Sequence, residues 1–360
     1  MTASRPAMTA SRAARGAAAR RRRAAAIAAV VMTAAVAVAV SRLGGGPEAG
    51  PSGLDGSAGA RRSELLVLQV VGAEDPLLAM IGTGPGERDA SFFSVPFDLM
   101  LTVPGQGEAR AGEVAALDAE TVRVALSNTF GTWAEHVAVL DLEGLSAVVD
   151  RAHGLEVNVP GFYATREGDL GPGAVRLSGP QVVALLGLDG EGAEARWASV
   201  VQGLLRRPVR LGARDLAETD GLAGVRRVLR GARGASLATF PTTSVAGSVL
   251  VPLQPDFDRQ VARHFGSRTP VPVIVENGVG VPGLGREVAT VLVPLGYRVV
   301  VSQNADLFGY QRTRVVANGA AAVGDARRIQ GALGVGRVGV SQVPSGIGDI
   351  TIIVGEDFTG

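Results

Sequence analysis

The sequence contains no cysteine and no lysine, and only three of its 360 residues are histidine. The missing cysteine excludes disulfides, thiolate metal sites and cysteine nucleophiles. The missing lysine excludes Schiff-base chemistry and the phosphate-binding lysine of a Walker loop. No two histidines are close enough in sequence to share a helical turn, which argues against a histidine-rich metal site; they are His136, His153 and His264.

Apolar residues make up 46% of the chain, which is enough to build cores and argues against wholesale disorder. The length predicts two or three domains of about 100–200 residues. Charge is distributed unevenly, because residues 1–42 carry eight arginines and no acid, which leaves 27 basic against 34 acidic side chains in the rest. A nucleic-acid-binding surface needs concentrated basic charge, so the acidic body predicts no nucleic-acid partner.

The N-terminal segment has the pattern of a membrane address. Arg20–Arg23 run directly into residues 24–40, which carry no charge and rise about 26 Å as a helix, at the short end of a membrane span. The basic flank predicts a single-pass transmembrane helix at 24–40, with the tail 1–23 in the cytoplasm and the bulk of the chain outside. A cleaved signal peptide is the alternative, since Ala37–Ala39 fits a small-x-small cleavage site. Both interpretations predict export.

Residues 41–62 are rich in Gly, Pro and Ser and are predicted to be a flexible linker. The next 200 residues alternate between strand and helix patterns, which is typical of a mixed-sheet α/β domain over 63–265. The expected helices cover 118–130 and 141–152. The expected strands are Leu65–Val71, Leu77–Gly82, Ser91–Val95, His136–Leu140 and Leu155–Val159.

A helix-breaking segment at 266–272 predicts a hinge before a second domain at 273–360. Few contacts are expected across this hinge, and residues 269–360 are expected to fold alone. Two β–α–β passes predict a small α/β sandwich there. Its expected helices are 286–295 and 324–333, and its expected strands are 271–276, 297–301, 313–317, 337–340 and 347–354.

Gly278, Gly280 and Gly283 form the G-x-G-x-x-G pattern of a dinucleotide site between a strand and a helix. We expect no cofactor there, because the domain has only about 90 residues and a paired Rossmann fold needs more. In addition, no acid follows the strand 297–301, where a ribose-binding carboxylate would stand. The glycines are explained by a tight turn and close packing.

Several segments of the first domain, in the right order, resemble the LytR-CpsA-Psr (LCP) family. They are Phe93–Asp98 with Val103–Gly105, Val139–Gly144, Val148–Asp150 with His153–Pro160, and Gly173 through Leu177–Gln181. The resemblance implies a membrane-anchored, outward-facing phosphotransferase that moves glycopolymer from a polyprenyl-pyrophosphate carrier onto peptidoglycan. It also implies arginines that hold the pyrophosphate, and acids that hold Mg²⁺ or activate the acceptor.

The catalytic pattern of that family is incomplete in this chain. Phe97 stands where the family has an arginine, between Pro96 and Asp98, and Gly187–Asp189 replaces an R-F-R run. Of the later R-x-x-R-Q pattern only Arg196 matches. The remnants are Asp75, Asp98 and Arg196, with Asp75 and Asp98 as the metal ligands if Mg²⁺ binds. Two acids and one arginine would repel a pyrophosphate, so we expect a degenerate site.

The second domain resembles the LytR C-terminal domain, which often follows an LCP domain in actinobacterial envelope proteins. The resemblance runs through Val275–Leu284, Leu295–Val299, Asn304–Asp306, Tyr310–Thr313 and Asp349–Gly355. It implies a binding or docking module outside the cytoplasm. The Arg-rich, Lys-free composition suits a high-GC bacterium.

The sequence therefore predicts an exported, membrane-anchored cell-envelope protein with a non-catalytic LCP-like domain that binds or scaffolds during wall glycopolymer assembly. Its expected partners are the membrane and a polyprenyl-phosphate lipid, a cell-wall glycopolymer or other envelope proteins. The alternative is an active phosphotransferase that attaches glycopolymer to peptidoglycan with Asp75, Asp98 and Arg196. A transcription factor is disfavoured by the exporting N-terminus and the acidic body.

Overall fold

The computed structural model describes residues 63–73, 77–84, 90–188, 192–207, 211–245, 247–342 and 345–359, all within one compact unit that spans 56–360. The predicted tail, transmembrane helix and linker at 1–62 lie outside the described residues. Among the helices that the structure does describe, none is both long and apolar enough to span a membrane.

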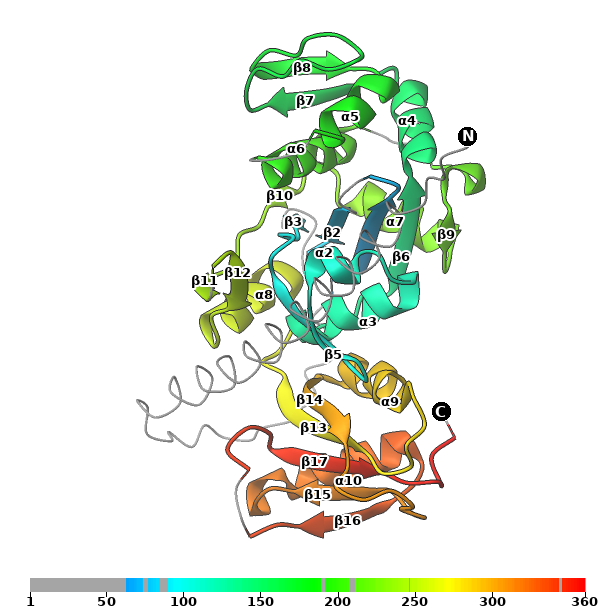
Figure 1. Ribbon diagram of the computed structural model, residues 1–360, viewed down its shortest axis with the longest axis vertical. Coiled ribbons are helices and arrows are strands. Elements are labelled where there is room, and N and C mark those ends of the chain that lie inside the picture. The colour runs from blue at the N-terminus through cyan, green and yellow to red at the C-terminus, as the bar shows by residue number, and fades with distance from the viewer. Residues whose placement is uncertain are drawn as a thin grey trace, which may run out of the picture. The chain divides into compact units, whose positions relative to one another are not determined.

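The first domain is built on a six-stranded mixed sheet in the order β10-β3-β2-β1-β6-β9 (Figure 1). β1 pairs antiparallel with β2 and parallel with β6, so the predicted mixed-sheet α/β class is confirmed. The strands are β1 (Leu65–Val71), β2 (Leu77–Gly82), β3 (Ser91–Ser94), β6 (His136–Asp141), β9 (Glu218–Thr219) and β10 (Ser236–Leu237).

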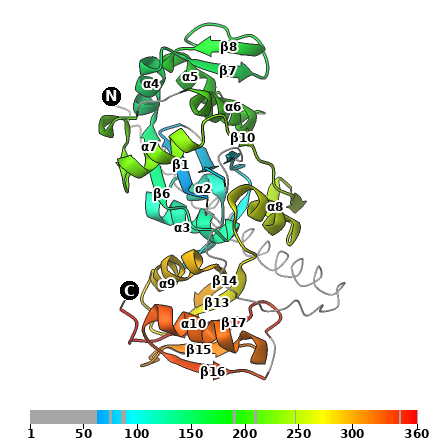
Figure 2. The same ribbon diagram turned by 180° about the vertical axis from the view of Figure 1, so that it is seen from behind.

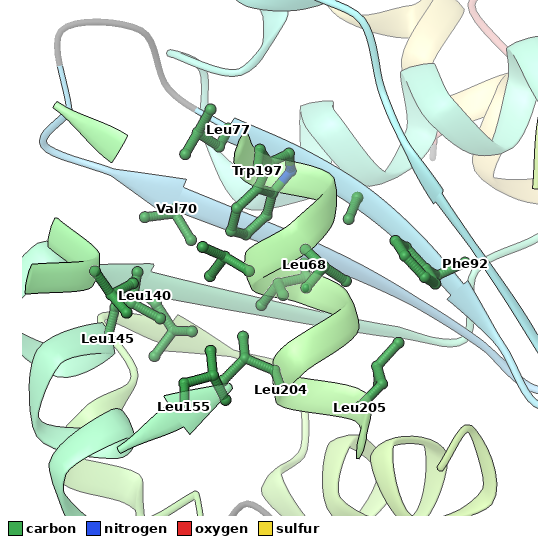
Figure 3. Packing of buried hydrophobic residues seen from close by; sticks show 14 of the residues in the cluster. Leu68, Val70, Leu77, Phe92, Leu140, Leu145, Leu155, Trp197, Leu204 and Leu205 are labelled. Carbon is green, nitrogen blue, oxygen red and sulfur yellow. The ribbon is translucent and has the colours of Figure 1, made fainter. Parts of the chain in front are cut away.

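Both faces of this sheet are buried, because its central strands are apolar at most positions. In β1, Leu66 and Leu68 face one core while Leu65 and Val67 face the other. The first core packs under α4 (Leu142–Arg151), α5 (Gly179–Leu186), α6 (Ala193–Arg206) and α7 (Leu222–Gly231), with Trp197 at its centre (Figure 3). The second packs under α2 (Ala111–Val114), α3 (Ala119–Phe130) and α8 (Asp256–Phe265).

Local signals set the helix ends. Asp118 accepts a hydrogen bond from the Thr121 amide at 3.0 Å, so α3 begins with a side-chain cap. It ends at Gly131, whose φ of 61° is left-handed. At the start of α5, the Gln181 side chain accepts from the Ser178 amide at 3.0 Å, which is half of a capping box. The helix that the LCP resemblance predicts after Leu177 therefore begins where the motif places it.

Three hairpins flank the described sheet. They are β4 (Met100–Val103) with β5 (Gly107–Arg110), β7 (Leu155–Val159) with β8 (Gly173–Leu177), and β11 (Thr242–Val245) with β12 (Val249–Pro252). The sequence pattern missed β4, β5 and β8, whose residues are short, partly exposed runs without clear alternation. The β4–β5 hairpin matters for function, since it carries Arg110.

The second domain has a five-stranded sheet in the order β14-β13-β17-β15-β16. β13–α9–β14 and β15–α10–β16 are the two predicted parallel passes, and β17 inserts between β13 and β15. The strands are β13 (Val271–Asn277), β14 (Tyr297–Asn304), β15 (Arg314–Ala317), β16 (Arg337–Val340) and β17 (Ile350–Val354), and the helices are α9 (Leu284–Leu292) and α10 (Val323–Leu333). The expected helix 286–295 ends earlier, because Val293–Leu295 form a 3₁₀ turn.

The expectation of few contacts across the hinge is wrong. β13 begins at Val271, so the end of the predicted 266–272 hinge is already strand. Arg298 in β14 forms a buried two-point ion pair with Asp258 in α8, at 2.6 and 3.1 Å. The Asn128 side chain, in α3, both donates to and accepts from the Val299 backbone at 2.8 Å. The two domains are therefore joined by buried polar contacts.

Candidate functional site

The predicted acid Asp98 stands in a tight turn after β3. The Leu99 amide donates to the Pro96 carbonyl at 3.1 Å, and the Gly112 amide donates to the Phe97 carbonyl at 3.0 Å. The Asp98 carbonyl accepts from the Leu250 amide at 2.9 Å. These bonds tie the turn to the start of α2 and to β12, so the Asp98 carboxylate is held on a fixed backbone.

Arg110 is the cation that meets this carboxylate. Its Nη1 donates to Asp98 Oδ1 at 3.1 Å, and both side chains are partly exposed. Arg110 ends β5 and precedes α2, and its backbone amide donates to Glu113 at 3.2 Å. The Arg110 guanidinium is therefore paired with Asp98, while the Arg110 backbone amide holds the Glu113 carboxylate.

A further acid, Glu194, lies close enough to feel Asp98. Burial of its carboxyl group raises the pKa of Glu194, and the Asp98 charge raises it further, whereas a hydrogen bond from the Phe97 backbone lowers it. Glu194 belongs to the first turn of α6. Asp98 therefore has a second carboxyl group, that of Glu194, among its neighbours.

Arg196, the predicted pyrophosphate ligand, lies inside the domain. Only 1% of its surface is exposed. Its Nη2 donates to the Leu188 carbonyl, and its guanidinium lies over the Tyr163 ring, 5.4 Å from the centroid. Among the described residues, the guanidinium that reaches Asp98 is therefore that of Arg110 and not that of Arg196.

The remaining predicted residue, Asp75, lies outside the described residues, so its position relative to Asp98 is not described. Within the described part of the chain, no three His, Asp or Glu side chains gather in a way that could hold a metal ion. Asp98 Oδ1 is also taken by Arg110. Mg²⁺ prefers several oxygen ligands in octahedral geometry, so the described residues do not fit the Mg²⁺ that the LCP resemblance implies.

Sequence reasoning missed Arg110, although a signal for it exists. Pro104-Gly105 lies between two short segments that can pair, and the observed register places Met100 opposite Arg110. A hairpin over residues 100–110 would have brought Arg110 back to the turn that holds Asp98. Position 110 is not one of the family's arginine positions, because Arg110 reaches the turn by chain reversal.

The glycine-rich turn of the second domain has a structural explanation. Asn277 Oδ1 accepts from the Val279 and Gly280 amides at 3.1 and 2.8 Å, and Gly280 and Gly283 have φ of 85° and 92°. A Cβ on Gly278 would lie 2.6 Å from the Val354 carbonyl oxygen. A cavity of about 380 Å³ beside this turn is lined by uncharged residues, among them Gln106, Ser302, Gln303 and Asn304.

The fold and the site thus define a two-domain α/β protein with an arginine–carboxylate pair in a turn of its first domain. Residues 270–358 match a protein-family model described as LytR cell envelope-related transcriptional attenuator. No curated protein matches the chain by sequence.

Several solved structures are similar to the chain. A transcriptional regulator from Enterococcus faecalis has 15% identity over 57% of this chain and 88% of that chain, with a TM-score of 0.48. The LytR-CPS2A-psr family protein TagT of Bacillus subtilis, with bound octaprenyl pyrophosphate lipid, has 14% identity, coverages of 59% and 95% and a TM-score of 0.47. A LytR-Csp2A-Psr enzyme from Actinomyces oris has 19% identity, coverages of 57% and 90% and a TM-score of 0.45.

The family model confirms the prediction of a LytR C-terminal domain, because its match spans nearly all of the residues that carry the resemblance. Two of the three similar structures are described as LCP-family proteins.

Proposed function

We propose that the chain is a membrane-anchored envelope protein that binds a polyprenyl-phosphate-linked glycopolymer, or the glycopolymer itself, during cell-wall assembly and does not transfer it. The observation that carries this proposal is the ion pair of Arg110 with Asp98, next to Glu113 and Glu194. Phosphoryl transfer from a pyrophosphate needs preorganised positive charge on the leaving oxygens. Among the described residues, the guanidinium beside Asp98 is already paired, and the neighbouring ionisable side chains are acids.

Arg196 supports the same proposal. A buried guanidinium that bonds a backbone carbonyl and lies against an aromatic ring stabilises the fold around α6. Turning it toward a pyrophosphate would break its bond to the partly buried Leu188 carbonyl. The binding role therefore relies on surfaces other than the family's arginine clamp.

The transferase alternative has one observation in its favour. Arg110 reaches Asp98 from outside the family's motifs, and additional arginines there would supply the charge that the motifs lack. Among the described residues, Arg110 is the only guanidinium with an ion pair to Asp98. A single paired arginine falls short of a pyrophosphate clamp, so the binding protein remains the proposal.

The deciding experiment incubates the purified full chain with Mg²⁺, a polyprenyl-pyrophosphate-linked glycan and peptidoglycan acceptor. We expect no transfer product. Measurable turnover that is lost on Asp98→Ala would instead establish the transferase and reject the binding role.

Localisation is tested separately, with a reporter that is active only outside the cytoplasm fused after Gly360. A signal from that fusion is expected, whereas a cytoplasmic readout would reject the envelope assignment.

A gain-of-function pair tests the charge explanation. Phe97→Arg with Gly187→Arg restores two of the missing guanidiniums and should tighten binding of a pyrophosphate lipid by about a hundredfold before screening, since each charge-assisted hydrogen bond contributes about 1.5–3 kcal/mol. Phe97 packs against the first core, so thermal stability is measured in parallel. The control pair, Val281→Arg with Leu295→Arg, adds the same charge at exposed positions of the second domain and should leave binding unchanged.

A further inference from the structure

The sheet of the C-terminal domain is covered by helices on one face only. Alternate residues such as Val315 and Ile352 are fully buried in the core with α9 and α10, while their neighbours Val316, Thr351 and Ile353 on the opposite face are only partly buried. Helix α10 lies across the first face (Figure 2), and strands β15–β17 are open to view from the other side (Figure 1). A half-covered sheet leaves a surface on which a ligand can lie.

A concave surface lies at the free edge of this sheet. A cavity of about 850 Å³, open to solvent, is lined by the loop between β14 and β15 and by residues of β15 and β16. Three apolar side chains of this lining are unusually exposed: Leu307 at 70%, Phe308 at 57% and Val340 at 50%. The Phe308 ring lies beside Gly280, where a Cβ would be in ordinary contact with it at 3.4 Å. The Phe308 side chain thus lies next to the glycine-rich turn and stays largely accessible to solvent.

The same lining carries three exposed arginines, Arg312, Arg314 and Arg337. Arg314 and Arg337 are register partners on the parallel strands β15 and β16, so their Cα atoms are about 4.8 Å apart. Like charges directly opposite each other destabilise a sheet. The Tyr310 ring lies under the Arg314 guanidinium, 5.1 Å from its centroid, which restricts the side chain without neutralising it.

The acids next to this loop are engaged elsewhere. Glu356 accepts from the Gln311 side chain at 2.8 Å, and Asp357 accepts from the Thr313 amide and hydroxyl at 2.7 Å. Among the described residues, none supplies a carboxylate to the guanidiniums of Arg312, Arg314 or Arg337. Within the described chain these guanidiniums therefore form no ion pair, and an anionic ligand would relieve the repulsion between Arg314 and Arg337.

We infer that this groove binds a phosphodiester-linked chain of sugars or polyols through Arg314 and Arg337, with Phe308 packed against the carbon face of a neighbouring unit. Guanidinium groups match phosphate oxygens in a two-point geometry, and the exposed ring supplies the apolar contact that a bare phosphate would not use. The surface is concave, whereas a lipid bilayer presents a plane of headgroups. A single polymer strand therefore fits the groove better than a membrane does.

The inference does not depend on the site around Asp98. The groove belongs to the C-terminal domain, and none of its described lining residues belongs to the turn that holds Asp98 or to the hairpin that carries Arg110. Absence of transferase activity therefore leaves the inference intact, and loss of polymer binding through groove substitutions says nothing about catalysis. Separate variants address the two sites.

The test uses the full chain in neutral detergent with poly(glycerol phosphate) as the probe, and measures the dissociation constant over a series of salt concentrations. Arg314→Gln with Arg337→Gln should weaken binding by about tenfold or more, because two phosphate contacts are lost. The same double variant should lower the slope of log affinity against log salt by about two. Phe308→Ser should weaken binding while leaving that slope unchanged.

The matched control is Arg268→Gln with Arg327→Gln, which removes the same charge from two exposed positions outside the groove. This control should leave the affinity nearly unchanged; an equal loss there would mean unspecific attraction and would overturn the inference. Loss on Arg110→Gln alone would move the polymer site to the first domain and also overturn it. Anionic phosphatidylglycerol vesicles form the second arm. Retention on vesicles that needs Arg314 and Arg337, without polymer binding, would replace the polymer by a membrane surface.

Discussion

The buried ion pair between the domains gives a quantitative prediction. Arg298 and Asp258 are each only 8% exposed in their side chains, and the Arg298 Nε also donates to the Asn128 carbonyl at 3.2 Å. Asp258→Ala would leave the guanidinium buried without its carboxylate. Removing one partner of a buried pair costs about 3–5 kcal/mol, so we expect a loss of that size in the free energy of unfolding.

Replacing both partners should cost far less. In Arg298→Met with Asp258→Leu no buried charge remains, and exchanging a buried pair for apolar residues of similar volume is often neutral or stabilising. The double-mutant cycle should therefore give a coupling energy of about 3 kcal/mol between the two positions. The uncharged hydrogen bonds between the domains are tested with Asn128→Ala, which removes both side-chain bonds to the Val299 backbone.

The two tryptophans report on different parts of the chain. Trp197 lies in the core between the first sheet and α6 (Figure 3). Trp133 follows α3 in the first domain and packs against the core of the second domain, so it reports on the interface. Urea unfolding is followed in Trp133→Phe and Trp197→Phe backgrounds, each of which leaves one reporter. Both reporters should give the same midpoint in the parent chain if the interface couples the domains. In Asp258→Ala the midpoint should fall, and the two reporters should separate.

Three results would refute this reasoning. If Asp258→Ala changed the unfolding free energy by less than about 1 kcal/mol, the pair would behave as a solvent-exposed one. If the apolar double variant were as unstable as Asp258→Ala, the loss would come from the shape of the site and not from an uncompensated charge. Different midpoints for the two reporters in the parent chain would show that the domains unfold independently.

Three further outcomes are expected. Burial raises the pKa of Glu108 above its ordinary 4.5. The ionised carboxylate therefore opposes folding at higher pH, and this penalty disappears below pH 4.5. Glu108→Gln should stabilise the chain at neutral pH and have no effect in acid, which urea unfolding at both pH values will measure. A Cβ on Gly144 would lie 2.2 Å from the Asp215 carbonyl oxygen, so Gly144→Ala should destabilise the folded chain by about 1–3 kcal/mol. A Cβ on Gly331, in α10, would meet open space, so Gly331→Ala should stabilise the folded chain by about 0.5–1 kcal/mol. The fragment 269–360 should show a cooperative thermal transition by circular dichroism, since it keeps nearly all of its core, but at a lower temperature than the full chain, because Val299 and Arg298 lose their partners.

The strands of both cores were predictable because their apolar runs are uninterrupted. Leu65–Val71 and Leu77–Gly82 are the observed β1 and β2 to the residue. The hairpin β4–β5 escaped prediction because each of its strands has four residues and β5 has no buried position. The position of β17 between β13 and β15 also escaped, since strand order depends on tertiary pairing that local periodicity does not encode.

The candidate site was predictable only as far as local motifs reach. The turn that holds Asp98 follows from Pro96 and the strand before it, but its partner Arg110 arrives through chain reversal. Arg196 occupies a motif position, yet its burial follows from the packing of α6, which no single-residue pattern reports. Likewise, nothing around Arg298 or Asp258 in the sequence signals a buried pair, because the two residues lie forty positions apart in different domains.

The environment of each arginine separates structural from binding roles in this chain. A guanidinium stays charged at any physiological pH and is costly to bury alone, so those inside the protein are committed: Arg298 to Asp258 and Arg196 to the Leu188 carbonyl and Tyr163. Arg110, though partly exposed, is matched by Asp98. Arg314 and Arg337 differ, because they are register partners on the adjacent strands β15 and β16 and no described residue forms an ion pair with either of them. An anion can therefore pair with Arg314 and Arg337 at the C-terminal sheet, whereas near Asp98 it would have to compete with the carboxylate that already pairs with Arg110. If this protein holds a phosphate-bearing polymer, the domain with no catalytic pattern is the one equipped to do so.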